Sequence, residues 1–199
     1  MRLVCLDMEG VLLPEIWIEI AQMSGIDELR RTTRDEPDYD KLMRQRLQIL
    51  REHDLGMPQI QGVLAAVEPL PGAREFLDEL RTFAQVIIIS DTFTQFLEPV
   101  LHKLNRPTVF CNELVIDDDG FIADYRMRCN PTKLTTVQAL QSCGFETVAS
   151  GDSFNDLAMI KASSAGFLYR TTDAIKAANP DVPTCESLPE LLEALKGVL

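Results

Sequence analysis

Short apolar runs that each end in polar residues recur along the chain and alternate with helical patterns. The apolar runs are Leu3–Leu6, Val86–Ile89, Thr147–Ala149 and Ala165–Leu168, and the helical patterns are Ala73–Phe83, Phe93–Leu104, Leu134–Cys143 and Asp156–Ala162. Continuous apolar strands between amphipathic helices are typical of a mostly parallel sheet covered on both faces. The sequence therefore predicts an α/β, Rossmann-like fold, in which ligands bind beyond the carboxyl ends of the strands.

The stretch from about residue 14 to 70 breaks this alternation, because it shows helical patterns and no convincing strand. A first helix is expected from Pro14, a second over Tyr39–Arg51 and a third over Pro58–Ala66. We predict that residues 14–70 form a small helical cap inserted after the first strand. Residues 1–13 and 71–199 would form the α/β catalytic core.

Charge and composition restrict the chemistry. A formal net charge of −12 argues against nucleic acid or an anionic membrane as partner, since both require a basic face. His53 and His102 are the only histidines, so any metal is expected to be held by carboxylates, which favours Mg²⁺ over a histidine-bound zinc. The absence of a membrane-length apolar run or a signal peptide, with five scattered cysteines and no CxxC pair, predicts a cytoplasmic protein with reduced thiols.

Four polar clusters fall at the predicted strand ends or at the start of the following helix. They are Asp7-Met8-Glu9-Gly10, Ser90-Asp91-Thr92, Lys133 after Asn130-Pro131-Thr132, and Gly151-Asp152-Ser153-Phe154-Asn155-Asp156. The carboxyl ends of parallel strands meet at one edge of a sheet, so we expect these clusters to lie together. They combine a nucleophilic carboxylate, a hydroxyl group, an ammonium group and a further acidic pair, which is the inventory that phosphoryl transfer requires.

The first cluster would carry the covalent chemistry. We interpret Asp7 as the nucleophile that receives the phosphoryl group and also as a metal ligand. Glu9 would act as general acid to the leaving oxygen and then as base to the incoming water, and its main-chain carbonyl would also ligate the metal. Asp152 is expected to be a further metal ligand, and Asp156 either a ligand or a support for one.

The other clusters would hold the phosphate, and each also has a purely structural interpretation. We expect Ser90 and Lys133 to bind the phosphate oxygens. Ser90 or Thr92 could instead cap the following helix, and Asp156 could complete a capping box with Ser153. A single lysine most often lies on the surface. The shared sheet edge favours the chemical interpretation, because independent capping residues would not converge there.

The order of the clusters, from Asp7-x-Glu9 through Ser90 and Lys133 to Gly151-Asp152-x-x-Asn155-Asp156, resembles the haloacid dehalogenase superfamily of aspartyl-phosphate phosphatases. One departure is Glu9, where most phosphatases of that superfamily carry aspartate; the extra methylene shifts the carboxyl group by up to about 1.5 Å. In its Asp-x-Glu-Gly form, its residues 32–40 and its Leu42–Leu50 helix, the chain is similar to the bifunctional phosphoserine phosphatase/homoserine phosphotransferase subfamily.

The resemblance implies a Mg²⁺-dependent enzyme that acts on O-phospho-L-serine and passes the phosphoryl group to water or to homoserine. It also implies a homodimer. On this basis the substrate site includes Ser90, Asp91, Thr92, Lys133 and Asn155, together with two residues of the cap.

The two cap residues are Arg46 and Glu15. Arg46 is spaced four residues from both Leu42 and Leu50, so it lies on an apolar stripe where an unpaired cation is costly. A substrate carboxylate would pair with it in a fork geometry, and Glu15 would receive the substrate ammonium group. Alternatively, Arg46 reaches solvent or pairs within the cap, and Glu15 favours a helix N-terminus.

Three other functions compete with this hypothesis. The first is a phosphatase of the same superfamily for another small phosphate ester. The second is a phospho-receiver signalling module, which also uses aspartate, Mg²⁺, a hydroxyl group and lysine, but which is shorter and has no place for a cap. The third is a catalytically silent binding protein, against which the retention of Asp7, Glu9, Lys133 and Asp152 argues.

Overall fold

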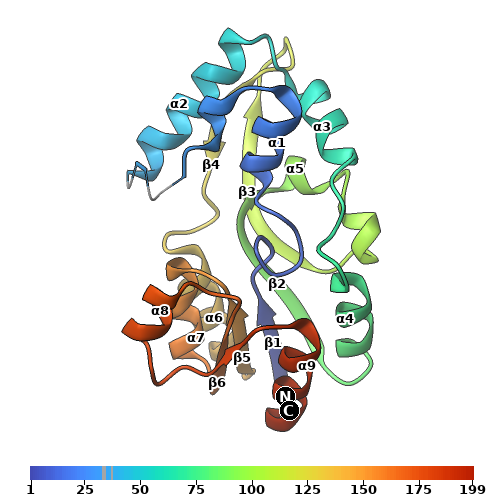
Figure 1. Cartoon of the computed structure of the whole chain (residues 1–199), viewed down its shortest axis with the longest axis vertical. Coiled ribbons are helices and arrows are strands. Elements are labelled where there is room, and N and C mark those ends of the chain that lie inside the picture. The colour runs from blue at the N-terminus through green and yellow to red at the C-terminus, as the bar shows by residue number, and fades with distance from the viewer. Residues whose placement is uncertain (33–34, 37) are drawn as a thin grey trace.

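A seven-stranded sheet forms the centre of the computed structural model, which describes residues 1–32, 35–36 and 38–199 (Figure 1). The strand order is β4-β3-β2-β1-β5-β6-β7, and all neighbouring strands are parallel except the antiparallel β3–β4 pair. The strands are β1 (Arg2–Leu6), β2 (Gln85–Phe93), β3 (Val109–Ile116), β4 (Ile122–Arg126), β5 (Glu146–Gly151), β6 (Ala165–Tyr169) and β7 (Thr184–Cys185). The predicted α/β fold is confirmed.

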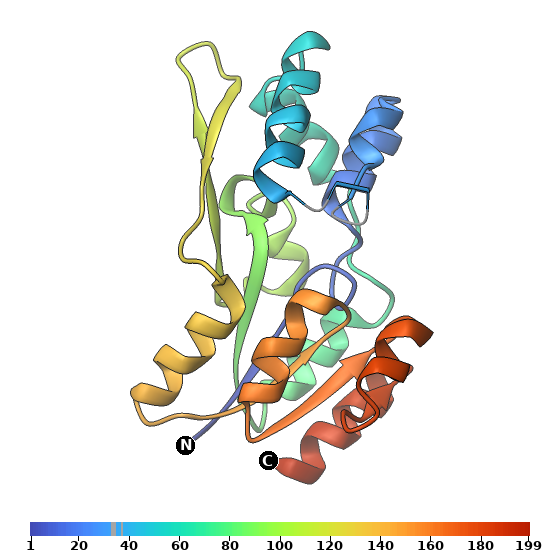
Figure 2. The ribbon, with the colours of Figure 1, turned by 90° about the vertical axis from the view of Figure 1, so that its left-hand side faces the viewer.

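Both faces of the sheet are covered, which explains the continuous apolar runs. In β1, Val4 and Leu6 belong to one buried cluster, whereas Leu3 and Cys5 belong to the cluster on the opposite face. The first face packs against α4 (Ala73–Leu80) and α9 (Leu188–Val198), and the second against α6 (Thr132–Ser142), α7 (Leu157–Ala162) and α8 (Asp173–Ala178) (Figure 2).

The four predicted apolar runs lie in β1, β2, β5 and β6. The prediction of one helix over Phe93–Leu104 is wrong, because β2 extends to Phe93 and only α5 (Thr94–Leu97) and the 3-10 helix η2 (Leu101–Leu104) follow. Pro99 interrupts the pattern, since proline has no backbone N–H to continue a helix. Strands β3, β4 and β7 were not predicted, because the β3–β4 pair alternates buried and exposed residues at the sheet edge and β7 is two residues long.

Between β1 and α4 the regular secondary structure of the described residues is helical, apart from an isolated bridge between Glu9 and Leu13. The helices are α1 (Ile16–Ser24), the 3-10 helix η1 (Asp27–Arg30), α2 (Tyr39–Glu52) and α3 (Met57–Ala65), and they stand beyond the carboxyl ends of the parallel strands (Figure 1). Helix α1 begins at Ile16 rather than at Pro14. Thr33, Arg34 and Pro37, which belong to the segment that carries part of the family resemblance, lie outside the described residues. The division into a cap of residues 14–70 and a core stays a prediction.

The β3–β4 hairpin reaches from the sheet to helix α2 (Figure 2). The Tyr125 hydroxyl on β4 donates a hydrogen bond of 2.7 Å to Asp40 on α2, and Arg51 at the other end of α2 pairs with Asp117 at 2.5 Å. The hairpin therefore fixes α2 at both ends. All five cysteines are free, and none of the helices in the described ranges combines the length and apolar character needed to cross a membrane.

Candidate active site

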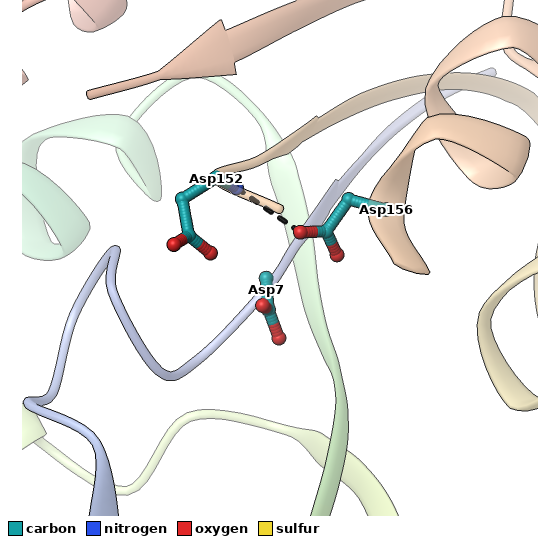
Figure 3. A group of neighbouring side chains, drawn as sticks. All are labelled: Asp7, Asp152 and Asp156. Carbon is teal, nitrogen blue, oxygen red and sulfur yellow. Dashed lines mark hydrogen bonds between the residues drawn. The ribbon is translucent and has the colours of Figure 1, made fainter. Parts of the chain in front are cut away.

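Asp7, Asp152 and Asp156 meet at the carboxyl ends of β1 and β5. The backbone N–H of Asp7 donates to the carbonyl of Ser150 at 3.0 Å, which fixes the end of β1 beside the end of β5. Each of the three aspartates offers a carboxylate oxygen within 4.8 Å of the other two (Figure 3). The adjacency of β1 and β5 thus brings together two clusters that are separated by more than half of the chain.

Lys133, in the first turn of α6, supplies the positive charge of this group. Its Nζ atom lies 2.8 Å from Asp7 Oδ1 and 2.5 Å from Asp156 Oδ1, and the residue is 3% exposed. Burial alone would lower the pKa of Lys133, but the neighbouring carboxylates of Asp156 and Asp7 outweigh burial and raise it. Lys133 is therefore a buried, charged group and not the surface lysine of the structural interpretation.

Asp156 holds the loop that carries Asp152. Its Oδ2 atom accepts a hydrogen bond of 3.0 Å from the backbone N–H of Asp152 (Figure 3). The same atom accepts hydrogen bonds from the backbone N–H of Ser153 at 2.9 Å and from the Ser153 hydroxyl at 3.0 Å. This is the predicted capping box, at the start of the 3-10 helix η3 (Phe154–Asp156). The other carboxylate oxygen of Asp156, Oδ1, contacts Lys133. Both oxygens of this side chain are therefore held by residues of the protein.

The group carries more negative than positive charge. Three carboxylates surround one ammonium group, and no ion pair joins Asp152 to a cation of the described residues. Burial raises the pKa of Asp7 well above its ordinary range, with a further contribution from Asp156 that Lys133 opposes. Burial and the charge of Asp156 raise the pKa of Asp152 to about 7. A cation would relieve this imbalance, and an all-oxygen donor set fits Mg²⁺.

Gly10 allows Asp152 to approach the loop after β1. A Cβ atom at Gly10 would lie 2.6 Å from the Asp152 carboxyl carbon, and the residue has a φ of +77°. We expect Gly10→Ala to displace Asp152 and to weaken cation binding and turnover by at least about tenfold, besides a backbone cost of about 1–2 kcal/mol.

Gly25→Ala is the matched control for Gly10→Ala, because Gly25 has a φ of +73° with no atom within 4 Å of the added Cβ. Chemical denaturation would measure the backbone cost in both variants, and steady-state kinetics the loss of turnover. Equal kinetic effects of the two substitutions would contradict the role assigned to the close approach.

Glu9 lies in the loop after β1 and contacts the start of α1. Its Oε2 atom accepts a hydrogen bond of 3.1 Å from the backbone N–H of Ile16, the first residue of α1. Burial and the charge of Glu15 raise the pKa of Glu9 to about 8, while the Ile16 N–H acts in the opposite direction. At neutral pH Glu9 therefore carries a proton, as a general acid requires.

Ser90, Asp91 and Thr92 lie within β2, although the sequence predicted that this strand ends at Ile89. The register with β3 shifts between Ile89 and Phe93, and such bulges re-aim side chains. Ser90 is 1% exposed, and its oxygen accepts a hydrogen bond of 3.2 Å from the Thr92 N–H, which leaves the hydroxyl hydrogen to donate. The O–H of Ser90 is thus available to an anion.

Asp91 connects three segments of the site. Its Oδ1 atom accepts a hydrogen bond from the Thr132 hydroxyl at the start of α6, and its Oδ2 atom accepts one of 2.8 Å from Asn155. The buried Asn112 side chain on β3 donates to the Asp91 carbonyl at 2.9 Å. Sequence reasoning missed Thr132 and Asn112. The position of Thr132 directly before Lys133 was an available signal, whereas nothing in the sequence revealed the register that places Asn112.

Arg46 is buried on α2, at 7% exposure. Its Nη2 atom donates to the carbonyl of Arg31 at 2.6 Å, and no carboxylate of the described residues forms an ion pair with it. Burial lowers the pKa of Arg46 to about 10, although interactions with the ionised forms of Tyr39, Glu9 and Glu15 oppose this effect. Arg46 therefore remains a cation at neutral pH and lies within the electrostatic range of Glu9 and of the exposed Glu15.

Comparison with known proteins gives a consistent set of similarities. A family model for haloacid dehalogenase-like hydrolases matches residues 1–164. The phosphoserine phosphatase ThrH of Pseudomonas aeruginosa is 44% identical over 191 residues, which cover 96% of this chain and 93% of that protein. A phosphoserine phosphatase of Pseudomonas syringae pv. tomato is 44% identical over 190 residues, covering 96% of this chain and 80% of that protein.

Solved structures show the same fold at lower identity. A phospho-aspartyl intermediate analogue of phosphoserine phosphatase superposes with a TM-score of 0.78 at 21% identity, covering 96% of this chain and 97% of that one. A substrate-bound phosphoserine phosphatase complex also has a TM-score of 0.78, at 22% identity, covering 98% of this chain and 96% of that one. These two structures support the assignment of the fold.

Proposed function

The chain belongs to the haloacid dehalogenase-like hydrolases, and on this premise we propose that it is a phosphatase that hydrolyses O-phospho-L-serine through a phosphoryl group carried on Asp7. The observation that carries the proposal is the position of Asp7, which is buried at the end of β1 with its carboxylate on Lys133 and with Asp152 and Asp156 beside it. The two relatives at 44% identity, both named phosphoserine phosphatases, support the choice of substrate.

The covalent step uses Asp7 and Glu9. An Asp7 carboxylate oxygen attacks phosphorus, an aspartyl-phosphate bond forms and the ester P–O bond breaks. The proton of Glu9 passes to the departing serine oxygen. The resulting Glu9 carboxylate then takes a proton from the water that attacks the phosphoryl group. Inorganic phosphate leaves, Asp7 is regenerated as a carboxylate and Glu9 again carries a proton.

The phosphoryl oxygens would be held by the ammonium group of Lys133 and the hydroxyl groups of Ser90 and Thr92. These donors come from α6 and β2 and are already buried, so little reorganisation is needed when charge develops on the oxygens. Asn155, held by Asp91, would complete the phosphate site from the η3 loop. Asp91 accepts hydrogen bonds with both carboxylate oxygens, from Thr132 and from Asn155. It would therefore contribute to substrate binding indirectly, by positioning these two residues.

Asp7, Asp152 and the main-chain carbonyl of Glu9 would hold Mg²⁺, with Asp156 as a further ligand or as support for Asp152. When bound, the ion would reduce the electrostatic repulsion between the Asp7 carboxylate and the phosphate group of the substrate. The surplus of negative charge in this buried group supports the proposal.

We expect Mg²⁺ to stabilise the protein independently of catalysis. At a free concentration of about one hundred times its dissociation constant, the ion should raise the free energy of unfolding by about 2.7 kcal/mol. Asp152→Asn should abolish most of this gain, whereas Asp118→Asn, which removes an exposed carboxylate of the β3–β4 turn, should leave it intact. Thermal unfolding of the two variants, with and without Mg²⁺, measures this gain in the free energy of unfolding. An equal gain in the two variants would refute Asp152 as a ligand.

The amino-acid part of the substrate would bind the cap. Arg46 is a buried cation without a carboxylate partner among the described residues, so a substrate carboxylate would compensate a charge that is costly to leave alone. Glu15 is exposed beside Glu9 and would receive the substrate ammonium group. The two residues together would distinguish an amino-acid ester from a simple phosphate ester.

The test incubates the purified protein with O-phospho-L-serine and Mg²⁺, with and without homoserine, and quantifies phosphate, serine and phosphohomoserine. We expect many phosphates released per chain, and in the presence of homoserine some phosphohomoserine. Release that stops near one phosphate per chain would identify a phospho-receiver instead. Turnover of other small phosphate esters without any on phosphoserine would reject the substrate, and turnover without phosphohomoserine would reject the transfer to homoserine. The homodimer stays a prediction of the family resemblance.

A further inference from the structure

The guanidinium group of Arg46 lies over the face of an aromatic ring that belongs to a different helix. Its central carbon is 4.4 Å from the centroid of the Trp17 ring, which belongs to α1. The polar contacts of the group are few: Nη2 donates to the Arg31 carbonyl, Nη1 lies 3.9 Å from the Met43 sulfur, and the buried Nε has no hydrogen-bond partner among the described residues. The Trp17 ring is therefore a main contact of the guanidinium group within the described residues.

Trp17 is itself held in place from the core. It is 8% exposed, and its ring packs edge-to-face on Phe96 of α5 with 5.3 Å between centroids. Phe96 packs in the same way on Phe93 at the end of β2, at 5.6 Å. Ring contacts thus connect Trp17 through Phe96 to Phe93, which lies on the strand that carries Ser90.

We propose that Trp17 is the positioning residue of Arg46: its ring sets the plane of the guanidinium group so that the group meets the substrate carboxylate in a fixed orientation. A fork-like pair between a guanidinium group and a carboxylate requires the two planes to be aligned, which a flexible side chain attains only at an entropic cost. Stacking on a rigid ring removes part of that cost before the substrate binds. The inference rests on the proposed function, since it assigns the ligand of Arg46 to the same substrate.

A purely structural role of Trp17 as an apolar residue of the cap is the competing explanation. Burial alone would make any large apolar side chain adequate at position 17, and its loss would affect every substrate alike. A positioning role instead depends on the aromatic face and on Arg46. The two explanations therefore differ in how a substitution at Trp17 combines with one at Arg46.

The test is a double-mutant cycle on phosphoserine hydrolysis with Trp17→Leu and Arg46→Met. We expect Trp17→Leu to raise KM for phosphoserine about tenfold with kcat little changed, and to have less than about a twofold further effect when Arg46 is already methionine. Trp17→Phe, which keeps an aromatic face, should stay within about threefold of the unsubstituted protein. An equal rise of KM in both Arg46 backgrounds, or an equal loss in the Phe and Leu variants, would overturn the inference.

Fluorescence provides a second measurement that needs no turnover. Trp17 is the only tryptophan of the chain, so its emission reports the environment of this ring alone. We expect Arg46→Met to shift that emission, and phosphoserine to shift it in the protein with Arg46 but not in the Arg46→Met variant. An emission spectrum unchanged by Arg46→Met would contradict the stacking. Absence of phosphoserine hydrolysis in the unsubstituted protein would instead reject the proposed function, so the two failures are distinguishable.

Discussion

Replacing Asp7 with asparagine is expected to lower kcat for phosphoserine by about a thousandfold or more. The amide has nearly the same shape as the carboxylate, but it cannot form the aspartyl-phosphate bond, so the covalent path is lost rather than weakened. The fold should persist, because burial already raises the pKa of Asp7 and a neutral group there is less costly. Single-turnover kinetics check the loss of the covalent step, and the free energy of unfolding checks that the fold persists.

The control for Asp7→Asn is Asp173→Asn, which removes a fully exposed carboxylate at the start of α8. This variant should keep the kcat of the unsubstituted protein. Retention of more than about one tenth of the activity in Asp7→Asn would show that the phosphoryl group does not pass through Asp7.

Replacing Lys133 with methionine should have the largest effect on stability. The substitution leaves Asp7 and Asp156 buried together without the ammonium group that now contacts both. Removing one partner of a buried ion pair typically costs about 3–5 kcal/mol, and we expect a loss of this size in the free energy of unfolding without metal. The loss of a phosphate-binding donor should also lower kcat/KM by about a hundredfold or more.

Lys196→Met is the matched control, because Lys196 also contacts two carboxylates, those of Glu79 and Glu193, but on the surface. It should cost less than about 1 kcal/mol. Urea denaturation of both variants provides the comparison. A similarly small loss in Lys133→Met would mean that the charges of the site are balanced in some other way.

The sequence predicted the fold where local pattern and burial agree. The four runs in β1, β2, β5 and β6 are buried on both faces, so their apolar residues are continuous and easily recognised. The β3–β4 hairpin was not predicted, because only one of its faces is buried and its charged residues interrupt the apolar pattern. This omission mattered for the cap, since the hairpin holds α2 at Asp40 and Arg51.

For the site, the sequence identified the candidate residues, but it did not identify the residues that contact and hold them. The grouping of Asp7, Asp152 and Asp156 follows from one rule, that the ends of parallel strands share an edge, and these aspartates do lie together. Lys133 contacts Asp7 from the first turn of α6, which follows the antiparallel strand β4, so this rule does not account for its position. The capping box at Ser153 and Asp156 was also predicted and coexists with the contact to Lys133. The roles of these residues remain proposals.

Contacts between distant segments could not be predicted. The contact of Arg46 with Trp17 is one example, because it depends on how α1 and α2 are placed in space. Asp91 is a second example, because its hydrogen bonds to Thr132 and Asn155 require β2, α6 and η3 to be placed in space. Periodicity describes one element at a time and carries no information on such neighbours.

The most direct test of the central claim is to locate the phosphoryl group on the protein during turnover. The protein would be mixed with phosphoserine labelled in its phosphate group and with Mg²⁺, quenched rapidly in acid, digested and analysed by mass spectrometry. We predict an acid-stable, base-labile label on the peptide that contains Asp7, and none in Asp7→Asn. Phosphate released at the normal rate without any labelled Asp7 peptide, or a label on another residue, would contradict the account.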